Sequence, residues 1–246
     1  MCRTLVAPLV ALIAFISPLP LLSADQAVPG WGNFINPDMD CSFTHDKGKL
    51  TLSVPGTPHD LGIERGQMNA PRVLQAVKGD FVVQVKVSGK FGPGAQLLND
   101  RLPYHGADLL LFKDEQTYIR IGRGNYIRPD TGESFHYANF ELRSGGELTR
   151  VGLETDLALD DGKDTYLRLE RHGDKILGAA TQDGVKWSYL EPKIVALPAH
   201  LLVGVAAVNT SGQAFAPMFS EFKLFKETNS RRKQNKQHPA DGQSAN

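Results

Sequence analysis

The residue pattern that most constrains the fold is an alternation of apolar and polar side chains with a period of two. In the segment 80–88 the odd positions are apolar and the later even positions are polar. Successive side chains of a β-strand point to opposite faces, so this alternation predicts a strand with one buried face. The segments 118–121 and 139–143 alternate in the same way. Further strands are expected at 49–54, 164–170, 175–181 and 219–225.

The segments 107–112 and 201–208 are interpreted as continuous apolar runs. Such runs are typical of central strands that are covered on both faces. The sequence indicates no amphipathic helix of ten or more residues. Turns are expected at 113–116 and 172–174, and Asp183-Gly184 predicts a type I′ hairpin, in which both central residues need positive φ. Many short strands without helices predict an all-β fold, a two-sheet antiparallel β-sandwich.

The two ends of the chain differ in composition from the middle. Residues 1–24 carry one charge, Arg3, followed by an apolar run and small residues, which predicts a signal peptide and a secreted or periplasmic protein. A retained membrane anchor is the alternative, disfavoured by late prolines at positions 18 and 20. Residues 25–226 are interpreted as one β-sandwich domain. Residues 227–246 lack aromatic residues and are expected to form a disordered polar and basic tail.

Charge and cysteine content narrow the function classes. The chain has 27 Lys and Arg against 27 Asp and Glu, and this balance argues against a nucleic-acid binder. Without the signal peptide, Cys41 is the one remaining cysteine, so no intrachain disulfide is expected. A lone Cys41 is interpreted as a small buried hydrophobic residue. No membrane span is expected in the mature chain, and the oligomeric state stays open.

Several segments together resemble a known superfamily. They are Trp-Gly at 31–32, DMDC at 38–41, VPGTPHDL at 54–61, NAPR at 69–72, GDF at 79–81, YIR at 118–120, YLRLER at 166–171, DGVKW at 183–187, LVGVAA at 202–207 and FSEF at 219–222. The chain resembles the concanavalin A-like lectin/glucanase superfamily. Within it, it is similar to a family of secreted bacterial domains of unknown function, with relatives in the C-terminal sandwich of some β-xylosidases. The resemblance covers about residues 30–226 and implies a jelly-roll sandwich without implying an activity.

Signatures of catalysis are scarce. The sequence has no Gly-x-Ser-x-Gly elbow, no HExxH motif and no phosphate-binding glycine loop, and no two histidines have the spacing of a preformed metal site. Glucanases of the superfamily carry paired carboxylates on one strand, whereas Glu141 and Glu170 each lie alone on an expected strand. No catalytic residue and no organic cofactor is therefore expected. The acidic pairs 38/40 and 160/161 leave a structural calcium ion as an alternative to a metal-free domain.

A sugar-binding sheet face is the favoured hypothesis for a site. Sugars bind to polar side chains that meet their hydroxyls and to aromatic rings that meet their C–H faces. If their strands adjoin, six polar-side residues would form such a surface: Gln84, Lys86, Tyr118, Arg120, Arg168 and Glu170. The alternative is a solvated sheet face without a ligand.

Loop residues add further ligand-binding candidates, each with a structural alternative. His59 and Asp60 follow two prolines, so they lie in a rigid turn and either contact a ligand or hold the loop. Tyr104 and His105 follow the loop 92–103, which is expected to overhang a groove. Trp187 follows the expected hairpin and serves either as a stacking platform or as cover for its own hairpin.

Three functions remain open from the sequence. The first is a secreted non-catalytic module that binds carbohydrate or a glycan-containing surface. The second is a glycoside hydrolase or a related sugar-active enzyme. The third is a structural or adhesion module. A set of candidate residues converging on one surface would favour the first two.

Overall fold

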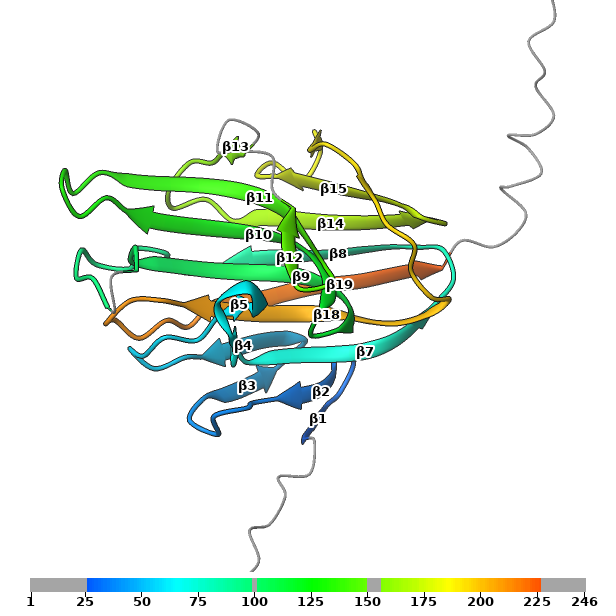
Figure 1. Ribbon diagram of the computed structural model, residues 1–246, viewed down its shortest axis with the longest axis horizontal. Helices are drawn as coiled ribbons and strands as arrows, with labels where there is room; N and C mark the ends of the chain where they lie inside the picture. Colours follow the sequence, from blue (N-terminus) through cyan, green and yellow to red (C-terminus); the bar gives the residue numbers. More distant parts are fainter. Residues whose placement is uncertain (1–25, 99–100, 150–155, 227–246) are drawn as a thin grey trace, which may run out of the picture.

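A computed structural model describes residues 26–98, 101–149 and 156–226. These residues form two large antiparallel sheets that pack face to face, one in front of the other in Figure 1. The signal-peptide prediction for residues 1–24 and the tail prediction for 227–246 lie outside the described residues. Within the described part of the chain, no helix has the length and apolar character needed to cross a membrane.

The first sheet has nine strands. In spatial order they are β1 (Gln26–Val28), β2 (Gly32–Ile35), β7 (Arg72–Lys78), β18 (His200–Asn209), β9 (Tyr104–Asp114), β10 (Thr117–Ile127), β11 (Ser134–Ser144) and β12 (Glu147–Thr149), with β13 (Leu157–Ala158) also pairing with β11. The two segments read as apolar runs lie on β18 and β9, which are neighbours in the middle of this sheet. Their prediction as central strands is therefore confirmed.

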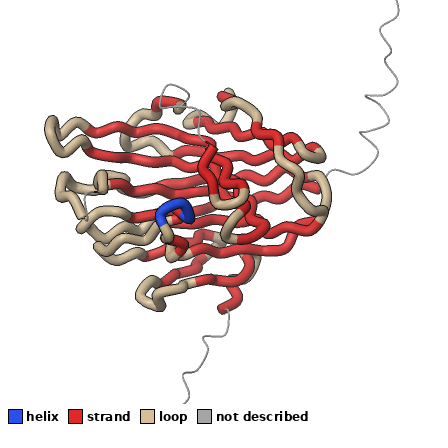
Figure 2. The backbone as a smooth tube through the Cα atoms, viewed as in Figure 1, coloured by secondary structure: helices blue, strands red, loops and turns tan. Residues whose placement is uncertain are grey.

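The second sheet has eight strands. In spatial order they are β16 (Ser188–Tyr189), β15 (Lys175–Thr181), β14 (Thr165–His172), β8 (Phe81–Ser88), β19 (Met218–Lys226), β4 (Lys49–Ser53) and β3 (Ser42–Asp46), with β17 (Lys193–Ile194) also pairing with β15. Each strand predicted from the sequence is present, and strands dominate the tube view in Figure 2. The prediction of a two-sheet antiparallel β-sandwich is confirmed.

The core lies between the two sheets, as the alternation requires. On β8, Phe81, Val83, Val85 and Val87 are fully buried, and the residues between them are partly exposed. They belong to one cluster with inward residues of the nine-stranded sheet such as Ile119. Each such side chain contributes about 1.5–3 kcal/mol when removed from water, so the sandwich needs no disulfide. Cys41 is buried and free, as expected.

One turn prediction is wrong. Asp183 is not one of the described residues with positive φ, and a type I′ turn needs positive φ at both central positions. Asp183-Gly184 therefore does not form a type I′ turn. Instead, the Asp183 carboxylate accepts hydrogen bonds from the main-chain N–H groups of Val185 and Lys186, both at 2.8 Å, within a longer connection to β16. Residues 47 and 48 both have positive φ in the two-residue turn between β3 and β4, so the I′ geometry occurs there.

A small element covers part of the nine-stranded sheet on the face turned away from the core. Strands β5 (Leu61–Gly62) and β6 (Gln67–Met68) pair around a 3₁₀ turn, η1 (Ile63–Arg65), which is drawn in blue in Figure 2. Leu61 is fully buried there, and its carbonyl oxygen accepts a hydrogen bond of 2.9 Å from the Tyr118 hydroxyl. We call this surface the outer face of the nine-stranded sheet. It carries a set of buried charged side chains, including Asp108, Arg120 and Glu141.

Candidate functional site

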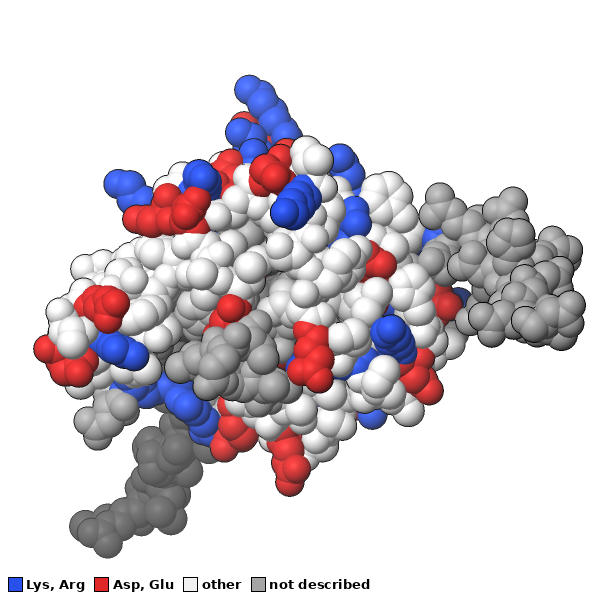
Figure 3. Space-filling view, turned by 90° about the horizontal axis from the view of Figure 1, so that it is seen from above, with Lys and Arg blue, Asp and Glu red and all other residues white. Residues whose placement is uncertain are grey.

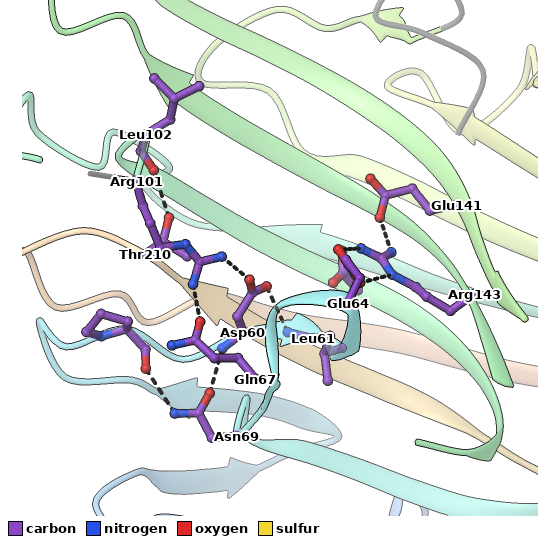
Figure 4. Close-up of polar contacts among 12 residues, drawn as sticks. Asp60, Leu61, Glu64, Gln67, Asn69, Arg101, Leu102, Glu141, Arg143 and Thr210 are labelled. Carbon is purple, nitrogen blue, oxygen red and sulfur yellow. Dashed lines mark hydrogen bonds and ion pairs between the residues drawn. The ribbon is translucent and has the colours of Figure 1, made fainter. Parts of the chain in front are cut away.

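The outer face of the nine-stranded sheet holds a chain of buried charges. Arg120 on β10 donates from Nη1 to Asp108 Oδ2 at 2.9 Å and from Nε to Glu141 Oε2 at 2.7 Å. Arg143 on β11 also donates to Glu141 and reaches Glu64 of η1 at 3.2 Å (Figure 4). Asp108, Arg120, Glu141 and Arg143 are at most 6% exposed. Charges this deeply buried are tolerated because each has an opposite partner.

The two carboxyl groups bound by Arg120 differ in proton affinity. Burial raises the pKa of Asp108 to about 6, the negative charge of Glu141 acts in the same direction, and the guanidinium groups of Arg120 and Arg143 offset this only in part. Burial acts in the same direction on Glu141, but Arg120 and Arg143 together outweigh it and hold the pKa of Glu141 well below its usual range. Two neighbouring carboxyl groups thus have different protonation behaviour near pH 6, a pattern that recurs at functional sites.

Three buried polar atoms near this chain have no hydrogen-bond partner among the described residues. They are Tyr104 Oη, Asp108 Oδ1 and Asn139 Oδ1. The Asp108 and Asn139 oxygens both lie over Gly122, which pairs with Asp108 and Asn139 in the strand register. Buried polar groups without partners are rare in folded proteins. These three therefore mark a place where a hydroxyl group or water would be stabilised once a local movement exposes them.

Glycines make room for these side chains. A Cβ atom on Gly106 or Gly124 would overlap the Tyr104 ring or hydroxyl, and a Cβ atom on Gly122 would overlap Asp108 Oδ1. Gly106 and Gly124 are directly paired across β9 and β10. The ring of Tyr104 consequently lies on a side-chain-free strip of the sheet.

Aromatic rings continue the same face beyond Tyr104. Tyr126 on β10 pairs in register with Tyr104 and with Phe135 on β11. The rings of Tyr126 and Phe135 stack with centroids 4.9 Å apart, and Tyr137 meets Tyr126 edge-on at 5.8 Å. All three rings are partly exposed. We call Tyr126, Phe135 and Tyr137 the aromatic cluster.

The structure divides the six residues predicted to share one sheet face. Tyr118 and Arg120 lie on the outer face of the nine-stranded sheet, where Tyr118 is 1% exposed beneath η1. The remaining four lie on β8 and β14 of the eight-stranded sheet: Gln84, Lys86, Arg168 and Glu170. The condition that the strands carrying all six residues adjoin is not met, because the two groups belong to different sheets.

The group on the eight-stranded sheet is linked by its own contacts. Arg168 donates to Gln84 at 2.9 Å, and its guanidinium lies over the Trp187 ring, 4.1 Å from the centroid. Glu170 accepts a hydrogen bond of 2.8 Å from Tyr189. Lys86 lies on the same strand as Gln84 and forms an ion pair of 2.8 Å with Asp164. Trp187 thus stacks on an arginine and keeps part of its surface exposed.

The loop candidates mostly hold the chain in place. Asp60 is buried and accepts hydrogen bonds from Arg101 and from the Leu61 main chain, while Asn69 accepts from the Asp60 N–H at 2.9 Å (Figure 4). His105 is 2% exposed, stacks on Phe215 at 4.3 Å and lies 2.9 Å from the Ser211 hydroxyl. Burial lowers the pKa of His105 to about 4.

Neither acidic pair considered for calcium is free of protein contacts. Asp38 accepts a hydrogen bond of 2.6 Å from Asn69, and Asp40 lies 2.9 Å from the His59 ring. Asp160 forms an ion pair of 2.6 Å with Lys163. Calcium needs six to eight oxygens, and each of these pairs supplies only two carboxylates.

The sequence matches no known family model, and no curated protein is similar to it in sequence. Several solved structures have a similar fold. A functionally unknown protein from Saccharomyces cerevisiae superposes with a TM-score of 0.62 at 17% identity, covering 80% of this chain and 97% of that chain. The GH43 protein BlXynB from Bacillus licheniformis superposes with a TM-score of 0.59 at 17% identity, covering 82% of this chain and 38% of that chain.

A xylan beta-1,4-xylosidase from Bacillus halodurans superposes with a TM-score of 0.51 at 12% identity, covering 75% of this chain and 38% of that chain. The chain thus spans 38% of the length of either Bacillus protein. At these identities the likeness concerns the fold.

Sequence reasoning missed most of the outer-face site. Asp108 lies inside a segment that was read as an apolar run, and it is a fully buried carboxyl group. Glu141 was expected to lie alone, but it shares Arg120 with Asp108 of a different strand. Phe135 and Tyr137 of the aromatic cluster are two positions apart, which places them on one face of a strand. This period-two pattern is visible in the sequence. Figure 3 shows Lys and Arg interspersed with Asp and Glu on the edge in view, without a broad area of one sign.

Proposed function

We propose that this protein is a secreted, non-catalytic β-sandwich module that binds carbohydrate through the outer face of its nine-stranded sheet. One observation carries the proposal: the partly exposed aromatic cluster lies beside three buried polar atoms that lack partners, Tyr104 Oη, Asp108 Oδ1 and Asn139 Oδ1. A sugar ring presents both kinds of surface that such a site needs, apolar C–H faces and hydroxyl groups.

The polar atoms of the site and the hydroxyl groups of a sugar have complementary hydrogen-bonding roles. Once a local movement exposes these buried atoms, Asp108 Oδ1 and Asn139 Oδ1 can accept hydrogen bonds from ligand hydroxyls, and Tyr104 Oη can donate or accept. Rings with two rotatable bonds, such as those of Tyr126 and Phe135, provide contact area at small entropic cost. Neutral net charge fits an uncharged ligand better than a polyanion.

Fold and sequence are compatible with this reading. The segments quoted above resemble the concanavalin A-like superfamily, and two neighbours are named as a GH43 protein and a xylosidase. We infer secretion from the apolar segment 1–24, which has the features of a signal peptide. The single domain over 25–226 is part of the same proposal.

A glycan-array screen, followed by calorimetry on each hit, tests the proposal. Phe135→Ala and Tyr126→Ala should each weaken binding about tenfold, equivalent to about 1.4 kcal/mol, because each removes a stacking ring. Tyr189→Ala is the matched control, since Tyr189 is 53% exposed but lies on the other sheet. If Trp187→Ala abolishes binding while Phe135→Ala leaves it unchanged, the outer face of the eight-stranded sheet is the binding surface instead.

A glycoside hydrolase remains the second candidate because of the split between Asp108 and Glu141. A carboxyl group with a raised pKa can act as an acid while a neighbour stays ionised, which is the division of roles in glycoside hydrolysis. Reducing-end release from a bound glycan, lost in Asp108→Asn with binding retained, would favour this enzyme over the binding module. Absence of binding to every glycan would leave the structural or adhesion module.

A further inference from the structure

A second cluster of chemistry-bearing side chains lies apart from the aromatic cluster. Asp38, Asp40 and Cys41 come from the connection between β2 and β3, and His59 comes from the loop before β5. We propose that these four side chains form a binding site for a divalent transition-metal ion of the Zn²⁺ type. The proposal is independent of carbohydrate binding.

The donor set selects the class of metal. One imidazole nitrogen, one thiol sulfur and two carboxylate oxygens are the ligand types that Zn²⁺ accepts in tetrahedral sites. Calcium and magnesium prefer oxygen alone, so Cys41 and His59 disfavour them. The acidic pair Asp160 and Asp161 lacks a thiol neighbour, and Asp160 is paired with Lys163.

The spacing of the donor atoms is close to that of a tetrahedral site. Zinc bonds of about 2.0 Å to N or O and 2.3 Å to S imply donor-to-donor distances of roughly 3.3–3.5 Å. His59 Nε2 lies 2.9 Å from Asp40 Oδ1 and 3.9 Å from Asp38 Oδ2. Cys41 Sγ lies 3.5 Å from Asp40 Oδ1, and the donor atoms of Asp40, Cys41 and His59 all lie within 4.8 Å of one another. Asp40, Cys41 and His59 thus form the compact part of the set, and Asp38 joins it through its 3.9 Å approach to His59.

The imidazole is oriented as a metal ligand. His59 Nδ1 lies 2.9 Å from the Thr57 carbonyl oxygen, which can only accept, so Nδ1 carries the donated hydrogen. In the neutral ring Nε2 then points its lone pair at Asp40 Oδ1, which is also an acceptor, so either a proton or a metal ion between them makes the contact favourable. A ring fixed through its second nitrogen to a carbonyl is the usual support of a zinc-bound histidine.

The surrounding chain holds the other ligands. His59 is 1% exposed, and its main chain exchanges hydrogen bonds of 2.7 and 2.9 Å with Asn209 of β18. Asn36 bonds to both main-chain groups of Cys41, at 2.7 and 3.3 Å, and Asn69 donates to Asp38 at 2.6 Å. Such outer contacts fix ligand orientation and raise affinity.

An ion has a route to the cluster. The Asp38 and Asp40 side chains are 47% and 43% exposed, whereas His59 and Cys41 are buried. A pocket of about 480 Å³ is lined in part by Cys41, Asn36 and Met39. The carboxylates therefore face solvent, and the sulfur and nitrogen form the inner wall.

The test is a metal titration of the full chain in a Cys2→Ser background, which leaves Cys41 as the one thiol. Calorimetry with Zn²⁺ should give one ion per chain. Co²⁺ should produce the absorption of a tetrahedral complex with a thiolate-to-metal charge-transfer band. Cys41→Ser should abolish that band, and Asp40→Asn should weaken Zn²⁺ binding at least tenfold. The Asp160→Asn and Asp161→Asn double variant is the control and should bind as the parent does.

Either of two outcomes would overturn the proposal. The first is that the folded parent chain shows no saturable binding of Zn²⁺ or Co²⁺. The second is a Co²⁺ spectrum that Cys41→Ser leaves unchanged. Circular dichroism establishes folding of each protein. If Asp40→Asn does not fold, the parent and Cys41→Ser titrations decide the question by themselves. In the absence of binding, the cluster is a hydrogen-bonded loop anchor.

Discussion

Arg120 is the residue whose loss should destabilise the outer face most. Its guanidinium is the one cation bonded to Asp108 and one of two bonded to Glu141, and all three side chains are at most 6% exposed. Arg120→Met keeps the apolar length of the side chain and removes the charge. Removing one partner from a buried charge network costs about 3–5 kcal/mol, and we expect a loss of unfolding free energy in this range at pH 7.

Part of this loss should depend on pH in a defined way. The folded pKa of Asp108 is about 6, above its ordinary value of 3.8, so in the parent its unfavourable contribution grows as pH rises from 3.8 to 6 and then stays constant. Without Arg120 the folded pKa should rise further, because Arg120 lowers it in the parent, and the unfavourable contribution then continues to grow above pH 6. One pKa unit corresponds to about 1.4 kcal/mol, so a rise of one unit would make the difference between variant and parent about 1.4 kcal/mol larger at pH 7 than at pH 5.

Urea unfolding followed by circular dichroism at pH 7 and pH 5 measures both quantities. Arg168→Met is the control: Arg168 is 24% exposed on the other sheet, and its loss should cost less than about 1 kcal/mol. In an Asp108→Asn background the pH-dependent part of the Arg120→Met effect should disappear. A cost below about 1 kcal/mol at pH 7, or a cost equal at both pH values, would refute the assignment of Arg120 as the counter-charge.

Three further perturbations have defined outcomes. Gly204→Ala places a Cβ atom against the Val73 main chain and should lower the free energy of unfolding by about 1–3 kcal/mol in urea titrations. Gly92→Ala is the control, because its Cβ atom meets open space, and it should change this free energy by less than about 1 kcal/mol. Phe81→Ala should cost about 3–5 kcal/mol in the same assay, because its ring is fully buried in the core. His105 has a pKa lowered to about 4, so the folded protein resists its protonation. As the pH falls from 6.5 to 4, the free energy of unfolding of the parent should therefore drop by up to about 3 kcal/mol relative to His105→Gln. Parallel pH profiles of the two proteins would contradict this.

The strands were predictable because their burial pattern is local. The alternation in 80–88 reports directly which side chains of β8 face the core. The hairpin at Asp183-Gly184 was not predictable from the dipeptide, because the Asp183 carboxylate caps two following N–H groups and favours a wider turn. The I′ turn occurs at Lys47-Gly48, where the strand pair leaves only two residues for the connection.

The candidate surface was harder to predict than the strands. Alternation shows which residues share one face of a strand, but it does not show which sheet the strand joins. Arg120 and Arg168 have equivalent positions in their local patterns, yet β10 and β14 belong to opposite sheets. The pairing of β14 with β8 and of β10 with β9 and β11 depends on long-range contacts that no short motif encodes.

Glycines in the interior of strands were the available signal for the outer-face site. Glycine weakens a strand, so its presence there indicates a close approach by another group. Gly122 and Gly124 share the face of Arg120 by the period of two, and Gly106 has the same parity as Asp108. In the structure these glycines lie directly beneath Tyr104 and Asp108, two of the three residues with unpartnered polar atoms. A search for strand glycines with matching parity on neighbouring strands would therefore have identified this part of the site from the sequence, without requiring a catalytic motif.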